Sequence, residues 1–444
     1  VNLFGLRFPF IASGILSVLL LYLIAKELFG SGAALLSAGI LSVNNYHIWI
    51  SRIGLMESPV IFFILVAVFL FLKALRDQRW FYPAVVATGL AILMKYTAAV
   101  LLPLFFVYLL WKRRDLLGAK RIALALGLLI LILSPVIIYN LKLYAARGHF
   151  DFQISYMLGQ RVPEWEVRPG REAPGGFVQR FENIFLWMKV GYSPLFSAAL
   201  FLSLLASLRL LKKDQGLQFL WLTILALVLL LFVIGPENRF MAMTAPFFAA
   251  AVAYGIKLMI ESPVLRKNLG FAAAAVLLVF EISYSINSYH ATVPRGKEGF
   301  HYSRLRRDSN AWGYNQLEAT LAGIMDGYYP QASFPPKFGF AKELNQNAKQ
   351  KAEAEGKQPK SILFVYDSRF FGISSLWYLT RHIIYEAWPV ITDNTYLQLT
   401  ADNPDYFRDA GITEILYIHT VETLRQPQEG DGRAAETLKN QLTE

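Results

Sequence analysis

The sequence predicts a polytopic α-helical membrane protein with a soluble α/β domain at its C-terminal end. Hydrophobic residues make up 55% of the 444 residues and charged residues only 17%, whereas soluble domains carry about 25% charged residues. The mean hydropathy is +0.39. About ten apolar segments follow one another up to residue 289, and the composition then changes to that of a soluble domain. We therefore expect a multi-span domain over 1–289 and an α/β domain over 290–444.

Each predicted span is an apolar run bounded by charged or turn-forming residues. A bilayer core needs about 20 such residues. The two runs that flank Lys95 are shorter, so we expect them to be tilted or partly re-entrant. The ten runs cover residues 8–28, 32–50, 58–75, 80–94, 96–111, 121–140, 193–211, 217–235, 239–258 and 268–288.

The basic residues predict the sidedness of the spans. Residues 1–289 hold 26 basic and 13 acidic residues and residues 290–444 hold 17 and 19, so the net charge of +11 comes from the apolar part. Of the 26 basic residues, 15 lie in alternate loops, which the positive-inside rule makes cytoplasmic. The other span ends, the loop at 141–192 and the C-terminal domain are then extracytoplasmic. This charge pattern indicates a membrane surface rather than a nucleic acid as the partner.

Composition also excludes several classes of protein. The chain has no cysteine, which excludes disulfide scaffolds, thiolate zinc sites, iron–sulfur clusters and cysteine nucleophiles. Disorder, collagen and coiled coils are excluded by the apolar content. The sequence begins Val1-Asn2-Leu3 without a signal-peptide pattern. We expect a preceding part with at least one further span.

Two segments outside the spans have patterns of their own. In the 141–192 loop, residues 177–189 place apolar side chains at helical spacing, which predicts a helix lying on the outer leaflet; the alternative is the start of the next span. In the C-terminal domain we predict strands at 361–367, 382–385 and 413–419, joined by helices at 370–380 and 403–411 in a parallel sheet. The charged composition of residues 342–358 predicts a solvated helix or linker there. No glycine-rich phosphate loop follows a strand, so no nucleotide site is predicted.

Charged residues at the edge of the membrane are costly and are therefore candidates for function. By the sidedness above, six of them share the outer face, which predicts a site for a charged ligand. Arginine suits phosphate because its fork donates two parallel hydrogen bonds, and lysine acts as a compact charge. The alternatives are snorkelling for Arg7 and Lys95, and ion pairs that cap spans for the others. The six residues are Arg7, Arg52, Glu57, Lys95, Glu237 and Arg239.

Two further polar residues are weaker candidates. Glu281 lies deep in the last span, where an internal polar contact is the better reading. His47 is the only histidine retained near the outer face, and a packing role is the more common one for such a residue. The six histidines show no metal-ligand spacing.

Four short motifs in order resemble a known family. They are Leu6-Arg-Phe-Pro9 followed by Tyr22–Gly30, Ser51-Arg52 with an acid at Glu57, Gly89–Lys95, and Asn238-Arg-Phe240 with Pro246. Together they resemble the GT-C glycosyltransferases that use polyprenyl-phosphate sugars, and among these the protein O-mannosyltransferases and lipid A aminoarabinose transferases. The resemblance covers roughly residues 1–260. The C-terminal domain carries no recognised motif.

The resemblance implies an inverting transfer of a sugar from a polyprenyl phosphate to a hydroxyl on a protein, lipid or glycan. It places Arg7 in support of the active loop and Lys95 near the carrier phosphate. Arg52 with Glu57 and Arg239 match further family positions, although Glu57 replaces a common Asp and Phe240 a Tyr. The family's catalytic base is an Asp that would lie upstream of Val1, so no residue here takes that role. Some members bind a divalent metal ion, for which this sequence assigns no ligands.

Two other classes of function stay open at this stage. A polytopic lipid or sugar transporter or flippase would place charges near the bilayer midplane and often show two related halves, and neither feature is visible. A non-catalytic scaffold that presents the soluble domain would not need four charged residues on one side.

Overall fold

The computed structural model consists of two compact units, one of membrane-type helices and one of α/β type. It describes residues 3–160, 162, 176–262, 267–291, 293–306, 313–332, 334, 339–368, 379–419 and 438. The first unit covers residues 1–309 and the second residues 310–444. We expected the boundary at residue 289. Residues 290–306 stay with the helices because Arg306 donates to the carbonyl oxygens of Ser288 and Ala291, and Ser303 donates to that of Val190.

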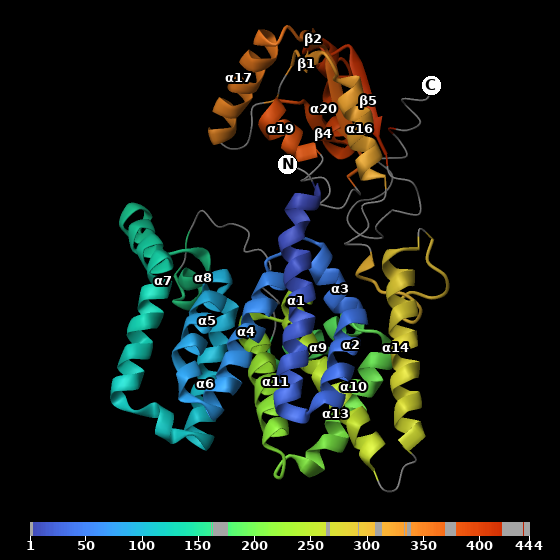
Figure 1. Cartoon of the computed structure of the whole chain (residues 1–444). Coiled ribbons are helices and arrows are strands. Elements are labelled where there is room, and N and C mark those ends of the chain that lie inside the picture. Colours follow the sequence, from blue (N-terminus) through green and yellow to red (C-terminus); the bar gives the residue numbers. More distant parts are fainter. Residues whose placement is uncertain are drawn as a thin grey trace. The chain divides into compact units, whose positions relative to one another are not determined.

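The first unit is a bundle of helices in which every predicted span falls on helical residues, although some of the spans are divided between two or more helices (Figure 1). Six helices in the described residues are long and apolar enough to cross a membrane, and the remaining segments are shorter apolar helices. The helices are α1 Leu3–Phe29, α2 Ser31–Val43, α3 Asn45–Arg52, α4 Glu57–Arg76, α5 Phe81–Met94, α6 Leu101–Lys112, α7 Ala119–Arg147, α8 Phe152–Met157, α9 Phe177–Gly191, α10 Pro194–Ser207, α11 Gln215–Ile234, α12 Asn238–Met241, α13 Ala245–Glu261 and α14 Lys267–Tyr289.

Local sequence explains where these helices begin and end. The Asn44 side chain accepts hydrogen bonds from the backbone of Tyr46 and His47, which ends α2 and starts α3 as an N-cap. Asp214 and Ser193 cap α11 and α10 in the same way. Gly30 has φ 87°, a left-handed value that favours glycine, between α1 and α2. The predicted span at 32–50 is thus two helices joined at a polar cap.

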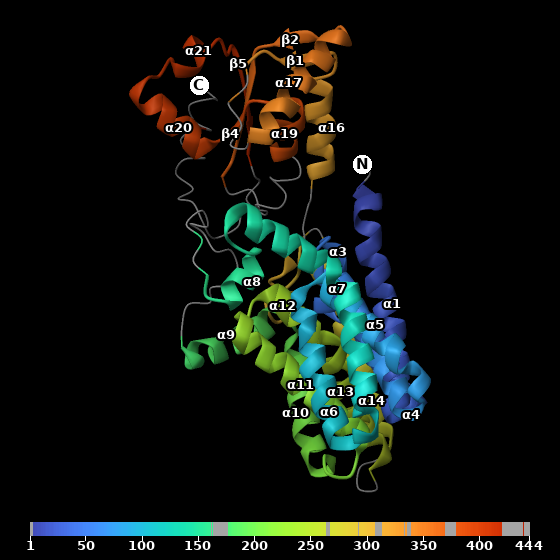
Figure 2. The same cartoon turned by 90° about the vertical axis from the view of Figure 1, so that its left-hand side faces the viewer.

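The core of the unit lies around α13, whose small residues let neighbouring helices approach. Ala249, Val252 and Ala253 are fully buried, and a Cβ on Gly255 would collide with Ser203 of α10. At the flank of the bundle, α7 has only Asn140 buried. In Figures 1 and 2 α7 stands at the edge of the helices, where an apolar outer surface suits lipid.

The second unit contains a parallel sheet of three strands in the order β4-β3-β5. The prediction of a parallel sheet is confirmed, as are the first and third strands and the charged helix. The strands are β3 Ile362–Tyr366, β4 Val390–Thr392 and β5 Glu414–Ile418, and a second parallel pair joins β1 Tyr328–Pro330 to β2 Gln358–Lys360. The helices are α16 Tyr314–Ile324, α17 Gly339–Ala354, α19 Arg381–Glu386, α20 Asp393–Asp402 and α21 Tyr406–Asp409.

The predicted strand at 382–385 is wrong, because these residues form α19. Their β-branched run is too short to distinguish a strand from a buried helix. The His382 ring stacks on Trp388 at 3.9 Å between ring centres, and its Nδ1 lies 3.0 Å from Glu386 one helical turn away. The second strand is β4, directly after this turn. The predicted helix at 370–380 falls almost wholly outside the described residues.

Candidate functional site

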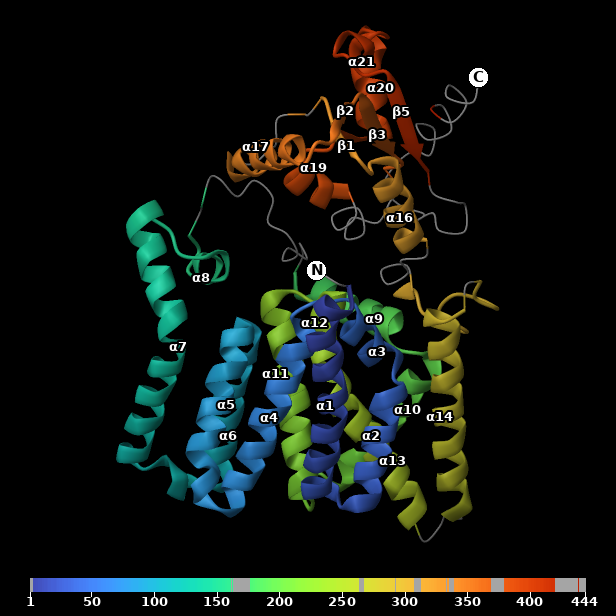
Figure 3. The ribbon, with the colours of Figure 1, turned by 45° about the horizontal axis from the view of Figure 1, so that its top comes forward.

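The candidate site lies at the end of the bundle where α1 begins, and Figure 3 shows α3, α9 and α12 at the same end. Lys95 follows α5 with an extended backbone, and a 3-10 turn over Tyr96–Val100 follows it. Its ammonium group forms an ion pair with Glu57, the first residue of α4. The Glu57 side chain is 3% exposed and that of Lys95 24%. Lys95 therefore neutralises a buried carboxylate and is itself still partly exposed.

A second charged pair adjoins the first. Arg239 in α12 lies with its Nε 3.5 Å from Oε2 of Glu237. Both cations lie over the ring of Phe240. Lys95 Nζ is 4.5 Å and Arg239 Cζ is 5.0 Å from the ring centre. An aromatic face attracts cations through its quadrupole. Phe240 therefore holds two positive groups from distant parts of the sequence beside each other.

Arg52 supplies a third cation at the end of α3. Its guanidinium lies 5.2 Å from the ring centre of Tyr289, and the charge of Arg7, an exposed residue near the start of α1, acts on it. The Nη1 atom of Arg52 is buried and has no hydrogen-bond partner among the described residues. Buried donors are normally paired. A buried guanidinium donor without a partner, beside a second arginine, suits an anionic ligand.

The structure brings the six predicted residues to one end of the bundle. The ion pair between Arg52 and Glu57, an alternative that their spacing suggested, is replaced by another pairing. Glu57 binds Lys95 rather than Arg52. The sequence distance of five residues suggested the Arg52–Glu57 pair, and the turn at 53–56 separates the two side chains into different surroundings.

Asp151 is a site-supporting residue that sequence reasoning missed. Its carboxylate accepts hydrogen bonds from Tyr96 Oη at 2.6 Å and from the Asn140 amide at 2.9 Å, and it caps α8 by accepting from Ile154 N. It thereby fixes the residue after Lys95 to the start of the long loop. The available signal was its position as an N-cap before the helical segment 152–157.

The remaining polar predictions have structural explanations. Glu281 is fully buried and accepts a hydrogen bond from Ser193, the expected internal contact. His47 lies with Nε2 3.1 Å from the carbonyl oxygen of Gly14, a packing role. Helix α9 forms as predicted, and it packs on the end of α11 through Phe177, whose ring stacks on Phe232 at 5.0 Å. No group of three His, Asp or Glu side chains within the described part of the chain is arranged to hold a metal ion.

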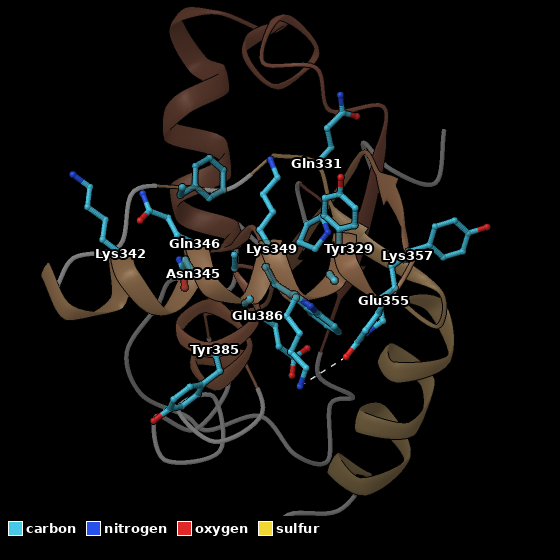
Figure 4. A pocket seen from close by; sticks show the side chains of 18 residues that line it. Tyr329, Gln331, Lys342, Asn345, Gln346, Lys349, Glu355, Lys357, Tyr385 and Glu386 are labelled. Carbon is cyan, nitrogen blue, oxygen red and sulfur yellow. Dashed lines mark ion pairs between the residues drawn. The ribbon is translucent and has the colours of Figure 1, made fainter.

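The second unit has a cavity of its own, of about 580 Å³ (Figure 4). Lysines and glutamine of α17, including Lys342, Gln346 and Lys349, line it together with Tyr329 and Tyr385. Positions 342, 346 and 349 share one helical face. Aromatic rings, amides and ammonium groups are suited to an organic ligand that carries negative charge.

A family model matches the first part of the helical unit. Residues 1–139 match the model described as dolichyl-phosphate-mannose-protein mannosyltransferase. Over these residues the resemblance to the protein O-mannosyltransferases is confirmed. The matched region contains four of the six candidate residues, Arg7, Arg52, Glu57 and Lys95.

Individual curated relatives match part of the chain. An uncharacterised protein of Aquifex aeolicus is 36% identical over 126 residues, which are 27% of this chain and 25% of that protein. YycA of Bacillus subtilis, whose name marks it as a proposed mannosyltransferase, is 31% identical over 134 residues, 30% of this chain and 20% of its own length. The chain thus matches a quarter or less of these curated relatives.

Among solved structures, ArnT from Cupriavidus metallidurans bound to undecaprenyl phosphate is similar over 87% of this chain and 71% of its own. Its TM-score is 0.48 and its sequence identity 13%. The oligosaccharyltransferase of Archaeoglobus fulgidus in complex with zinc and sulfate covers 91% of this chain with 54% of its own, at a TM-score of 0.48 and 14% identity.

Proposed function

We propose that the protein is an integral-membrane glycosyltransferase that moves a sugar from a polyprenyl phosphate to a hydroxyl group on a protein, lipid or glycan. The observation that carries this proposal is the group of cations at one end of the bundle. Lys95 and Arg239 share the ring of Phe240, and Arg52 keeps a buried donor without a partner. These residues begin and end helices of a membrane-type bundle whose first 139 residues match a glycosyltransferase family.

In this proposal the cations bind the phosphate of the donor. The acceptor oxygen attacks the anomeric carbon from the face opposite the phosphate, so the new C–O bond forms as the bond from carbon to phosphate oxygen breaks and the configuration inverts. The lipid phosphate leaves with the electron pair of that bond. Negative charge grows on its oxygen, and preorganised cations stabilise such charge in the transition state. The acceptor's proton passes to a carboxylate acting as general base.

Glu57 has a positioning role rather than the role of that base. Its carboxylate is buried and already paired with Lys95. A base must be able to take up the acceptor's proton, whereas protonation of Glu57 would leave Lys95 without its partner. Glu57 therefore holds the Lys95 ammonium in the site, and we assign the base to no residue described here.

The sidedness of the reaction is part of the proposal. The loops rich in lysine and arginine lie at the end of the bundle opposite the candidate site, since they follow α1, α4, α6, α10 and α13 (Figure 1). By the positive-inside rule that end faces the cytoplasm. We therefore place the reaction at the outer face of the cytoplasmic membrane, with the C-terminal unit extracytoplasmic.

The test measures consumption of a lipid-linked donor. The protein is expressed from its own gene in membranes, and radiolabelled undecaprenyl-phosphate sugars are supplied one sugar at a time. Arg52→Ala and Lys95→Ala are compared with wild type, and Lys120→Ala, an exposed residue at the opposite end, is the matched control. We expect each site variant to lose about 100-fold in rate or more, as removal of a transition-state donor does elsewhere.

The outcomes separate this proposal from its alternative, a lipid or sugar flippase. Loss of donor in wild type and in the Lys120 variant, but not in the site variants, supports the transferase and identifies the sugar. Equal loss in all variants contradicts the assigned site. Labelled lipid that crosses the bilayer intact, with no donor consumed, replaces the transferase with a flippase.

A further inference from the structure

A cavity of the helical unit lies at the end opposite the candidate site and has no part in the proposed reaction. Its volume is about 650 Å³. It is bounded by the ends of α1, α4 and α6, by the residues between α10 and α11, and by Tyr254 of α13. Because α4 has 20 residues, the two sites are separated by about 30 Å along that helix.

The cavity has an apolar wall and a basic rim. The wall is formed by leucines and by Tyr108, which is 5% exposed. The rim carries Arg76, Lys112, Arg113 and Lys213, which come from the ends of α4 and α6 and from the connection before α11. A wall of hydrocarbon below a rim of cations matches a molecule with an anionic head and an apolar tail.

The two acidic residues at this cavity are already bound within the protein. Glu27 lies 2.5 Å from Lys73 and 2.6 Å from Arg76. Asp214 caps α11 by accepting from the backbone nitrogen of Leu217 at 3.0 Å, and it accepts a hydrogen bond from Tyr254 at 2.8 Å. The carboxylates therefore order the floor of the cavity and do not neutralise the rest of its rim.

Two of the rim cations keep their charge available. Within the described residues, Lys112 and Lys213 form no ion pair, whereas Arg113 is bound to Asp115 at 2.8 Å. Lys112 Nζ lies 4.1 Å from the ring centre of Trp111. Trp111 is 53% exposed and Phe106, one turn earlier in α6, is 51% exposed. Exposed aromatic residues at the end of a span are typical of the membrane interface.

We propose that this cavity binds the headgroup of an anionic phospholipid, with the phosphate at Lys112 and Lys213 and an acyl chain along the leucine wall and the exposed face of α6. Basic pockets between membrane helices bind such headgroups elsewhere. The lining of the cavity favours a lipid over free phosphate. Inorganic phosphate would make no favourable contact with the apolar wall or with the neighbouring aromatic surface, whereas an acyl chain would.

The experiment uses the whole protein in detergent and measures lipid binding by native mass spectrometry. Phosphatidylglycerol and phosphatidylcholine with identical acyl chains are added separately to wild type and to a Lys112→Gln/Lys213→Gln variant. A Lys120→Gln/Arg209→Gln variant removes the same charge from the same end of the bundle without touching the cavity. Inorganic phosphate is added as a competitor in a further arm.

We expect wild type to bind phosphatidylglycerol at least ten-fold more tightly than phosphatidylcholine. The cavity variant should lose about five-fold per lysine, and the control variant should keep the preference. An equal loss in both variants would show general surface attraction and overturn the proposal. Displacement of the lipid by millimolar phosphate, or equal binding of both lipids, would overturn it as well. Lys213 is exposed, so Lys213→Gln alone keeps the test decisive if the double variant does not fold.

Discussion

The ion pair between Glu57 and Lys95 supports the sharpest prediction about this protein. Replacing Lys95 by Met keeps the length of the side chain but leaves the Glu57 carboxylate, which is 3% exposed, without a counter-charge. Removing one partner of a buried pair costs about 3–5 kcal/mol.

We therefore expect Lys95→Met to be destabilised by about 3–5 kcal/mol. Each kcal/mol moves the melting temperature of a domain this large by roughly 2 °C. The Glu57→Gln/Lys95→Met double variant should recover most of the loss, because no charge is left unpaired. Thermal unfolding of the purified protein, followed by size-exclusion chromatography, measures all three.

Two results would refute the reasoning about this pair. If Lys95→Met melted at the wild-type temperature, Glu57 would not be buried in the way its exposure indicates. If the double variant were as unstable as the sum of the two single variants, the pair would not interact energetically.

Three further predictions concern packing, the loop and the C-terminal unit. Gly191→Ala should lower the stability of the fold by about 1–3 kcal/mol, because the added Cβ would lie 2.6 Å from the ring of Tyr46. Gly127→Ala is the control, because its Cβ would meet nothing within 4 Å, and it should be neutral or stabilising. The melting temperatures of the two variants test this difference. Asp151→Asn should lower the melting temperature through weaker hydrogen bonds to Tyr96 and the start of α8, a loss of about 1–3 kcal/mol, and an unchanged value would contradict the network. Burial raises the pKa of Glu386, but the hydrogen bond and charge of His382 outweigh this and hold the pKa below its ordinary value of 4.5. The ionised Glu386 therefore stabilises the fold above pH 4.5, and this stabilisation is lost as the pH falls below that value. The Glu386→Gln variant should lose less stability on acidification of the second unit than wild type does. The difference should be less than about 1 kcal/mol, because the Glu386 side chain is half exposed.

Much of the helical unit could be predicted from the sequence. Long apolar runs have one stable solution in a bilayer, a helix, because every backbone group must be paired within the segment. All ten runs are helices, and the basic loops share one end as expected. The soluble unit was predicted less well. The strand at 382–385 was wrong because His382 and Glu386 contact each other across a helical turn, a pairing that a four-residue pattern does not show.

By itself, the sequence determined that the chain is a membrane protein, where its helices lie and which charged residues gather at one end, because hydropathy and charge act locally along the chain. Only the tertiary structure decided which charges pair. Glu57 binds Lys95, 38 residues away, and Arg52 is left with a buried donor, since burial and contact depend on how α3, α4 and α5 pack. The basic cavity at the other end is likewise a tertiary feature. Its lysines, one at the end of α6 and one before α11, are 101 positions apart, and packing alone brings them to one apolar wall.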